Sequence, residues 1–243
     1  MKLSKNMLGI IILAAGKGTR LNSRIPKCLQ ILAGKPMIDY VWDNFSSLNP
    51  KQVVGVVGFK KKILMDHLGS KVLYAWQKQA LGTAHAAMVG LKKLRPEINT
   101  VLVSNSDDAC FYKKNTLKKF LNKHKKNNYN FSFLTVKLKN LPSVSAVIKR
   151  RPLRLERAGK QKLYEVVCGA YLFKRDWLEE NLKKITPHSL TKEYYLTNLI
   201  YLALDESSEK VHPFLINAPE RLGVNTLSEL EKADSFMKKI RRK

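Results

Sequence analysis

A glycine-rich turn directly after an apolar run is the first stretch of the sequence that could do chemistry. The run 8–15 ends in Ala14-Ala15-Gly16-Lys17-Gly18-Thr19-Arg20, where few side chains obstruct the backbone N–H groups. Such a turn suits the binding of a phosphate or of a base edge. Two cations flank it, because Lys27 follows Arg20 by seven residues. This combination predicts a site that holds a triphosphate at its leaving end.

The turn matches neither of two common glycine motifs. A P-loop needs a glycine four residues ahead of Gly-Lys-Ser/Thr, and the sequence does not supply it. A dinucleotide-binding fingerprint needs a third glycine where Leu21 stands, and an acidic residue after the next strand. A simple strand-to-helix turn with surface cations is the alternative to a triphosphate site.

Short β-branched runs alternate with helical stretches, which is typical of an α/β sheet with crossover helices. We expect strands at 9–13, 52–57, 71–74, 100–103, 131–137, 144–149, 163–173 and 211–216. We expect helices after Pro36, over 82–94, along the stripe Leu117, Phe120, Leu121 and His124, and from a capping box of Thr226 and Glu229 onward.

Length and cysteine content limit the classes of protein to which the chain can belong. The 243 residues, 44% of them hydrophobic, are enough for one domain over 1–243 with a large core. Three widely spaced cysteines, Cys28, Cys110 and Cys168, match neither a disulfide framework nor a zinc site and fit a reducing compartment. The apolar run 8–15 is too short for a signal peptide or a membrane span. We therefore expect a cytoplasmic protein with no membrane span.

The charge is strongly positive and uneven. Forty-five Lys and Arg stand against nineteen Asp and Glu, a net charge of +26, and residues 113–162 hold sixteen of the cations and one acid, Glu156. A polyanionic partner or a solvated basic surface would explain this bias. The lysines of the stretch 113–126 lie mostly off its apolar stripe, and no aromatic ladder accompanies them, which argues against a nucleic-acid partner.

The stretch LAAGKGTRLNSRIPKCLQILAGKPMI, residues 13–38, closely resembles the signature of sugar-1-phosphate nucleotidyltransferases. Within that family it most resembles the uridyltransferase portion of the bacterial enzyme that makes UDP-N-acetylglucosamine. The resemblance implies a Rossmann-like, mixed and mostly parallel sheet flanked by helices, the nucleotide-diphospho-sugar transferase fold. It also implies a nucleotide-binding part at about 1–112, a sugar-phosphate-binding part at about 113–225 and a C-terminal helix at 226–243, with Arg20 and Lys27 as catalytic cations.

A second motif matches the same family on the nucleotide side. The stretch Gln77 to Ala86 resembles the family's Q-x-x-x-L-G-T-x-H-A, whose glutamine and Gly-Thr backbone recognise the base. An amide can donate and accept at once, as the reading of a uracil edge requires. The resemblance implies nucleotide-binding roles for Leu13, Ala14, Ala15, Gly16, Gly18, Thr19, Gln77, Gly82 and Thr83.

The resemblance also implies a magnesium site. Asp107, in TVLVSNSDD, stands where the family has a metal-binding aspartate, and Asn225, in LGVN, stands where it has a second ligand. A carboxylate and an amide oxygen suit Mg²⁺, which keeps few protein ligands. We expect Asp108 to point away, because neighbouring strand residues face opposite sides. Asn105 and Ser106 depart from the family pattern.

The sugar side matches less closely. The family positions that contact the sugar phosphate fall on Ser145, Glu156 and Val167, and the stretch TKEYYLTNLI, 191–200, resembles a family helix start. Val167 stands for an asparagine, Ser145 for a glycine and Asn198 for an aspartate. Because valine has no side-chain hydrogen bond to offer, this side leaves the identity of the acceptor open.

The implied reaction is Mg²⁺-dependent transfer of a nucleotide from a nucleoside triphosphate, UTP, to a sugar 1-phosphate, N-acetylglucosamine 1-phosphate, with release of pyrophosphate. The alternatives are glucose 1-phosphate, another sugar phosphate or phosphocholine as acceptor. A catalytically weak relative that binds nucleotide or nucleic acid is the non-enzymatic alternative. The family's bifunctional members continue into hexapeptide repeats, which this sequence does not contain, so acetyl transfer is not expected.

Overall fold

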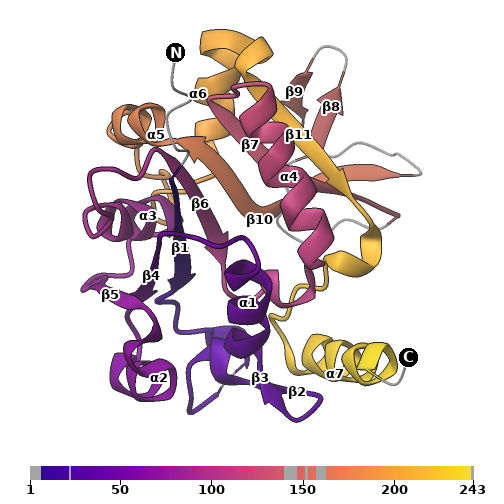
Figure 1. Ribbon diagram of the computed structural model, residues 1–243. Coiled ribbons are helices and arrows are strands. Elements are labelled where there is room, and N and C mark those ends of the chain that lie inside the picture. The colour runs from indigo at the N-terminus through magenta and orange to yellow at the C-terminus, as the bar shows by residue number, and fades with distance from the viewer. Residues whose placement is uncertain (1–6, 22, 140–146, 151–152, 157–162, 242–243) are drawn as a thin grey trace.

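The computed structural model describes residues 7–21, 23–139, 147–150, 153–156 and 163–241, which form a mixed sheet with helices on both faces (Figure 1). The strands are β1 (Leu8–Ala14), β2 (Ile31–Leu32), β3 (Lys35–Pro36), β4 (Gln52–Val57), β5 (Leu73–Trp76), β6 (Thr100–Asn105), β7 (Phe131–Leu138), β8 (Val147–Arg150), β9 (Leu153–Glu156), β10 (Tyr164–Lys174) and β11 (Val211–Ile216). The helices are α1 (Met37–Ser46), α2 (Lys61–Leu68), α3 (Thr83–Leu91), α4 (Lys114–Lys126), α5 (Arg175–Leu182), α6 (Asn198–Ser207) and α7 (Leu227–Arg241).

Strand β1 lies within the sheet between two parallel neighbours. It pairs with β4 and β6, and β4 pairs in parallel with β5. Strand β10 runs antiparallel to both β6 and β7, and β11 is parallel to β7. The order is therefore β11-β7-β10-β6-β1-β4-β5, with β8 paired to β10, β9 paired to β8, and β2 and β3 as a separate pair. This arrangement confirms the predicted Rossmann-like, mixed and mostly parallel sheet.

The alternating residues of β1 explain why both faces of the sheet carry helices. Ile10 and Ile12 belong to a buried cluster with apolar residues of α1, α2, α4 and α7. Ile11 and Leu13 belong to a second cluster with residues of α3, α5 and α6. Because successive strand residues face opposite sides, a continuously apolar strand such as β1 must be covered twice.

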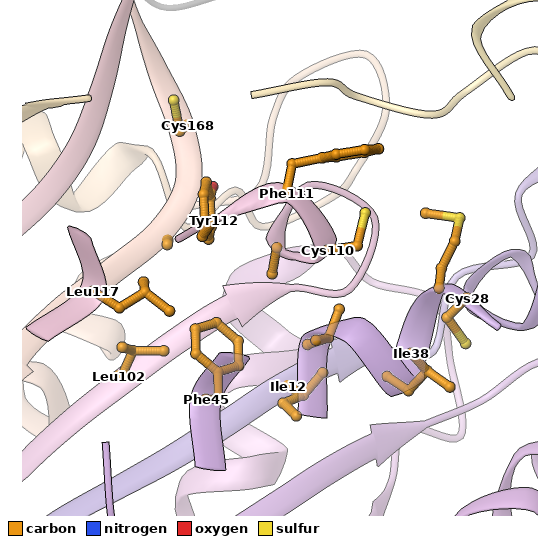
Figure 2. Close-up of a cluster of buried hydrophobic side chains, with 14 of the residues drawn as sticks. Ile12, Cys28, Ile38, Phe45, Leu102, Cys110, Phe111, Tyr112, Leu117 and Cys168 are labelled. Carbon is orange, nitrogen blue, oxygen red and sulfur yellow. The ribbon is translucent and has the colours of Figure 1, made fainter. Parts of the chain in front are cut away.

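The first of these clusters also contains the cysteines. Figure 2 shows Cys28, Cys110 and Cys168 among buried apolar side chains such as Phe45 and Leu117. All three thiols are free and buried.

The predicted strand bounds hold for β4 and β11 and shift elsewhere. The strand predicted at 71–74 is wrong by two residues, because Gly69–Lys71 form a 3₁₀ turn and the parallel register with β4 begins at Leu73. The strand predicted at 144–149 lies partly outside the described residues, and its described part belongs to β8. The helix predicted over 82–94 ends earlier, at Leu91.

Two helices, α2 and α5, have no start signal in the sequence, whereas the stretch 191–200 indicated the start of α6. The N-cap residues of all three helices, Lys60, Lys174 and Thr197, make no side-chain cap hydrogen bond. Packing stabilises these helices instead, since each buries apolar side chains against the sheet. Among the described helices, none is long and apolar enough to cross a lipid bilayer.

Helix α4 buries the whole predicted stripe, including its histidine. His124 is 3% exposed, and its Nδ1 lies 2.8 Å from the hydroxyl of Ser132 on β7. Burial, followed by the charges of Lys174 and Lys125, lowers the pKa of His124 to about 3. The imidazole is therefore neutral in the folded protein at every pH above that value.

We expect His124 to make folding stability depend on pH below about 6.5. In the unfolded chain His124 binds a proton near that pH, whereas in the folded chain it does so only near pH 3, so acid favours unfolding between these values. As the pH is lowered, the free energy of unfolding should fall more steeply in the wild type than in His124→Gln. The two slopes should differ by up to about 1.4 kcal/mol per pH unit. Urea unfolding of both proteins from pH 7 to pH 4 measures this, and parallel pH curves would contradict the assignment.

Candidate active site

A cavity of about 390 Å³ opens at the carboxyl ends of the parallel strands. Its walls include Leu13 and Ala14 at the end of β1, Asn105 at the end of β6 and Gln77 directly after β5. Ligands of open α/β sheets bind at this edge, where the strand ends leave a crevice. The glycine turn predicted to hold a triphosphate forms part of the same wall.

The cavity brings together every residue predicted for the nucleotide, for catalysis and for the metal. These are Leu13, Ala14, Ala15, Gly16, Gly18, Thr19, Arg20, Lys27, Gln77, Gly82, Thr83, Asp107 and Asn225. Six further described residues line the cavity without a role predicted from the sequence, namely Cys28, Ala80, Ala86, Asn105, Ser106 and Glu193.

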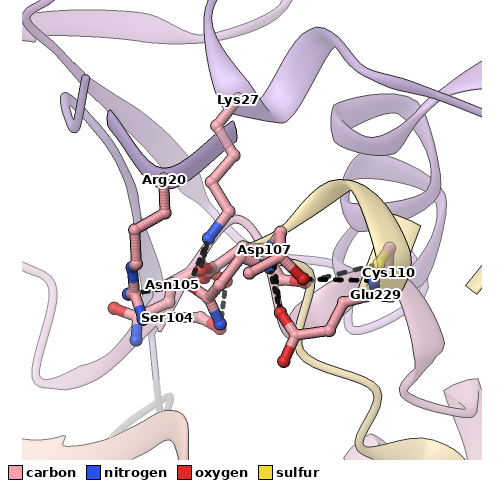
Figure 3. A network of polar contacts seen from close by, with 9 residues as sticks. Arg20, Lys27, Ser104, Asn105, Asp107, Cys110 and Glu229 are labelled. Carbon is pink, nitrogen blue, oxygen red and sulfur yellow. Dashed lines mark hydrogen bonds and ion pairs between the residues drawn. The ribbon is translucent and has the colours of Figure 1, made fainter. Parts of the chain in front are cut away.

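The ammonium of Lys27 holds two of these residues together (Figure 3). It contacts the carboxylate of Asp107 and donates a 2.8 Å hydrogen bond to Oδ1 of Asn225. The same oxygen accepts a 3.1 Å hydrogen bond from Nη2 of Arg20. A carboxylate and an amide oxygen, far apart in the sequence, thus face one positive charge.

Helix α7 fixes the position of Asn225. Its capping box forms as predicted, because the amide of Glu229 donates to Oγ1 of Thr226 at 3.2 Å and the Glu229 carboxylate accepts from the amide of Thr226 at 3.0 Å. The same carboxylate accepts from the amide of Asn225 at 2.7 Å. Further along α7, Asp234 accepts a 2.7 Å hydrogen bond from the amide of Ala33, next to β2. The helix therefore spans from Asn225 to the β2–β3 pair that follows Lys27.

Glycine is required in the turn at position 18. Gly18 has φ of +62°, and a Cβ there would lie 2.9 Å from Cβ of Lys27. Only a residue without a side chain lets the segment that carries Lys27 pack this closely onto the turn.

The side chain of Gln77 is oriented by two contacts inside the protein. Its Nε2 donates to the carbonyl of Gly82 at 3.1 Å and lies 3.0 Å from Nδ1 of His85. Because a carbonyl can only accept, the amide nitrogen must face Gly82, and its second hydrogen points to His85. In this arrangement Oε1 is the atom of the amide left for a ligand, and the role of Gln77 in reading a base stays a prediction. His85 acts here as an orienting neighbour of Gln77.

The loop before α3 packs against the backbone that leads into α6. Gly82 has φ of +93°, and a Cβ there would lie 2.6 Å from the carbonyl oxygen of Tyr194. The amide of Ala84 donates to that carbonyl at 2.8 Å, and Oγ1 of Thr83 accepts from the amide of Leu196 at 2.9 Å. These contacts bring Glu193 to the cavity wall. The family-like stretch 191–200 was the signal for this segment, although it did not reveal its proximity to Gly82.

Asp108 lies apart from the cavity lining, behind Asp107. The predicted reason, alternation within a strand, is wrong, because β6 ends at Asn105 and both aspartates lie in the turn that follows. The carboxylate of Asp108 accepts a hydrogen bond from the amide of Gly169 and faces Arg221. Burial and the neighbouring Asp107 raise the pKa of Asp108 to about 6.

No cysteine of the cavity region is poised as a nucleophile. Burial raises the pKa of the Cys28 thiol to about 12 and that of Cys110 well above its usual value. Since the thiolate is the reactive form, both side chains are inert near neutral pH. Chemistry at this site therefore depends on the oxygens and cations described above.

Of the residues predicted for the sugar phosphate, Val167 is the one whose side chain the structure describes, and it does not line this cavity. Val167 lies in β10 opposite Thr135 of β7 and packs against the second apolar cluster. Glu156 belongs to β9 and pairs with Val147, but its side chain lies outside the described part of the chain. Ser145 also lies outside the described residues.

Two oxygens of the cavity could hold a cation. The described residues contain no group of three or more His, Cys, Asp or Glu with the spacing of a metal site. Asp107 and Asn225 nevertheless present a carboxylate and an amide oxygen to the same positive charge. A hard cation that keeps most of its water ligands needs only one or two such groups.

Comparison with known proteins gives a consistent result along the whole chain. A family model described as the MobA-like NTP transferase domain matches residues 10–239. The bifunctional protein GlmU of Oceanobacillus iheyensis is 31% identical over 238 residues, which are 94% of this chain and 52% of the relative. The bifunctional protein GlmU of Enterococcus faecalis is 31% identical over 235 residues, 93% of this chain and 51% of the relative. The chain spans about half the length of these curated relatives.

A solved structure shares the fold. The crystal structure of 4-diphosphocytidyl-2C-methyl-D-erythritol synthase from Anaerococcus prevotii superimposes with a TM-score of 0.67, covering 96% of this chain and 99% of that one. The two sequences are 16% identical, so the likeness speaks for the arrangement of strands and helices alone.

We expect Gly82→Ala to destabilise the protein by about 1–3 kcal/mol, because it adds a Cβ that meets the Tyr194 backbone at a positive φ. Gly16→Ala is the matched control, since nothing lies within 4 Å of a Cβ at that position. Its effect should stay within about 0.5 kcal/mol. Urea unfolding measures both, and equal effects of the two substitutions would contradict the close approach at Gly82.

Proposed function

We propose that this chain, which belongs to the MobA-like NTP transferase family, transfers the nucleotide of UTP to N-acetylglucosamine 1-phosphate and releases pyrophosphate. The observation that carries the proposal is the convergence of Arg20, Lys27, Asp107 and Asn225 on one point beside the glycine turn. Two cations and two oxygen ligands at the phosphate end of a nucleotide-sized cavity suit phosphoryl transfer, which depends on charge neutralisation and alignment.

The choice of acceptor follows from the sequence motifs. The stretches at 13–38 and 77–86 resemble the uridyltransferase portion of enzymes that make UDP-N-acetylglucosamine. The 31% identity to bifunctional GlmU proteins supports the same acceptor. The departures at Ser145 and Val167 favour testing glucose 1-phosphate and phosphocholine beside it.

In the proposed reaction an oxygen of the sugar phosphate attacks the α-phosphorus of UTP, and the bond from that phosphorus to the pyrophosphate oxygen breaks. The attacking phosphate is already ionised at neutral pH, so no general base is required. Arg20 and Lys27 offset the charge that grows on the departing pyrophosphate. The open backbone at Gly16 lets the phosphates approach the turn.

Mg²⁺ is the cofactor we propose for the site, with Asp107 and Asn225 as its protein ligands. Their two oxygens fit a hard cation, and they already face a positive charge. When bound, Mg²⁺ would neutralise phosphate oxygens and hold the reacting groups together.

Lys27 must then change partner during the reaction. Its ammonium uses the same two oxygens that would bind the cation. A lysine has a flexible four-carbon stem, so the ammonium can turn toward the phosphates while the backbone stays in place. Lys27 thus neutralises Asp107 before substrate binds and the pyrophosphate afterwards.

The orientation of Gln77 supports a uracil base. Both amide hydrogens are used within the protein, which leaves Oε1 as an acceptor facing the cavity. The N3–H of uracil is a donor that such an oxygen can accept from. Cytosine has an acceptor at the equivalent nitrogen and would meet this oxygen with repulsion.

We expect Asp107→Ala to lower the rate of Mg²⁺-dependent pyrophosphate release by at least about 10²- to 10³-fold, because it removes the charged ligand. Asp43→Ala is the control, since Asp43 is half exposed and pairs only with Lys35 in the described residues. Thermal unfolding of both variants shows that they are folded, and EDTA should abolish turnover of the wild type. Near wild-type turnover of folded Asp107→Ala would end the metal assignment.

The experiment that tests the proposed function is a panel of UTP, CTP, ATP and GTP against N-acetylglucosamine 1-phosphate, glucose 1-phosphate and phosphocholine, scored by pyrophosphate release with Mg²⁺. We expect the highest kcat/KM for UTP with N-acetylglucosamine 1-phosphate. A preference for another pair would correct the substrates and keep the reaction. Inactivity with every pair, together with salt-sensitive binding of RNA or DNA, would instead identify a binding protein.

A further inference from the structure

A second polar cavity, of about 230 Å³, lies at the opposite end of the sheet. Strand β6 connects the two cavities, because its first residue, Thr100, lines this cavity and its last, Asn105, lines the active-site cavity. At about 3.3 Å per residue, the two ends of β6 lie roughly 17 Å apart. The second cavity is therefore separate from the candidate active site.

Two lysines line this cavity without a partner among the described residues. Lys125, near the end of α4, and Lys174, at the end of β10, are both half-buried lining residues. Within the described chain, neither ammonium has a hydrogen bond or an ion pair. Arg175 also lines the cavity, but its guanidinium already binds Glu179 at 2.7 Å and the carbonyl of Ile98 at 3.3 Å.

The described lining of this cavity carries more positive than negative charge. Burial lowers the pKa of Lys125, and burial together with the charge of Lys210 lowers the pKa of Lys174. The adjacent His124 is neutral and adds no charge. Asp176 is the acidic residue of the lining, and its side chain is exposed to solvent. Two half-buried ammonium groups that repel other cations are stabilised when an anion lies between them.

We propose that this cavity binds a compact phosphate-type oxyanion, either inorganic phosphate or pyrophosphate, through the ammonium groups of Lys125 and Lys174. A multiply charged oxygen anion offers acceptors to both lysines at once. The cavity is smaller than the roughly 300–1,000 Å³ of pockets that enclose drug-sized ligands, so its size favours a compact anion over a whole nucleotide. This binding does not depend on the proposed function of the other cavity.

The test is isothermal titration calorimetry of the full chain with potassium phosphate and, separately, with pyrophosphate, at constant ionic strength in KCl and without Mg²⁺. The wild type is compared with the double variant Lys125→Met/Lys174→Met. The matched control is Lys118→Met/Lys119→Met, which removes two exposed lysines from α4, the helix that also carries Lys125. Each of the three proteins is also measured with the added substitution Lys27→Met, which weakens anion binding at the active site. The comparison distinguishes binding at the second cavity from binding at the active-site cavity.

We expect the Lys125/Lys174 variant to lose at least about tenfold in affinity for the tighter-binding anion, a change of about 1.4 kcal/mol, and the control to keep wild-type affinity. The anion that binds more tightly identifies the size of the ligand. Unchanged affinity in the Lys125/Lys174 variant would overturn the proposal.

A stability measurement separates loss of binding from loss of folding. Without phosphate, the Lys125/Lys174 variant should unfold at the same temperature as the wild type or higher, because it removes two uncompensated charges. Saturating phosphate should raise the melting temperature of the wild type and leave that of the variant unchanged. A variant that is less stable than the wild type without phosphate would show that these lysines have partners in the protein, and the proposal would fall.

Discussion

The contact of one ammonium with two oxygens organises the candidate active site. Lys27 joins the turn after β6, through Asp107, to the start of α7, through Asn225. A half-buried carboxylate without a partner is costly, so Asp107 needs a positive charge in this position whether or not substrate is present. The glycine turn, the short segment after it and the capping box of α7 all serve to keep three distant parts of the chain within reach of that charge.

Much of the fold and of the candidate site could be predicted from the sequence, because residues close together in the chain determine it. The apolar run of β1, the glycines that follow it and the Thr226–Glu229 capping box each determine backbone geometry within a few residues. The helices α2 and α5 could not be located in the same way, because no local start signal marks them in the sequence and packing stabilises them. The place of Glu193 in the cavity wall depends on the close approach of Gly82 to Tyr194, which is a tertiary contact.

The acceptor side of the site was harder to predict from the sequence, for a different reason. The residue types at Ser145, Glu156 and Val167 predicted a sugar-phosphate side, and Val167, whose side chain the structure describes, does not line the nucleotide cavity. Val167 contributes to an apolar cluster, which agrees with a side chain that cannot hydrogen-bond. Part of the excess positive charge is also explained locally, since cations gather at both ends of β6 and face a cavity at each end.

Helix α7 couples two distant edges of the candidate active site. It is tied to Asn225 at its start and, through Asp234, to the backbone of Ala33 beside the strand pair that follows Lys27. A shift of this helix would therefore move Asn225 and the β2–β3 pair together.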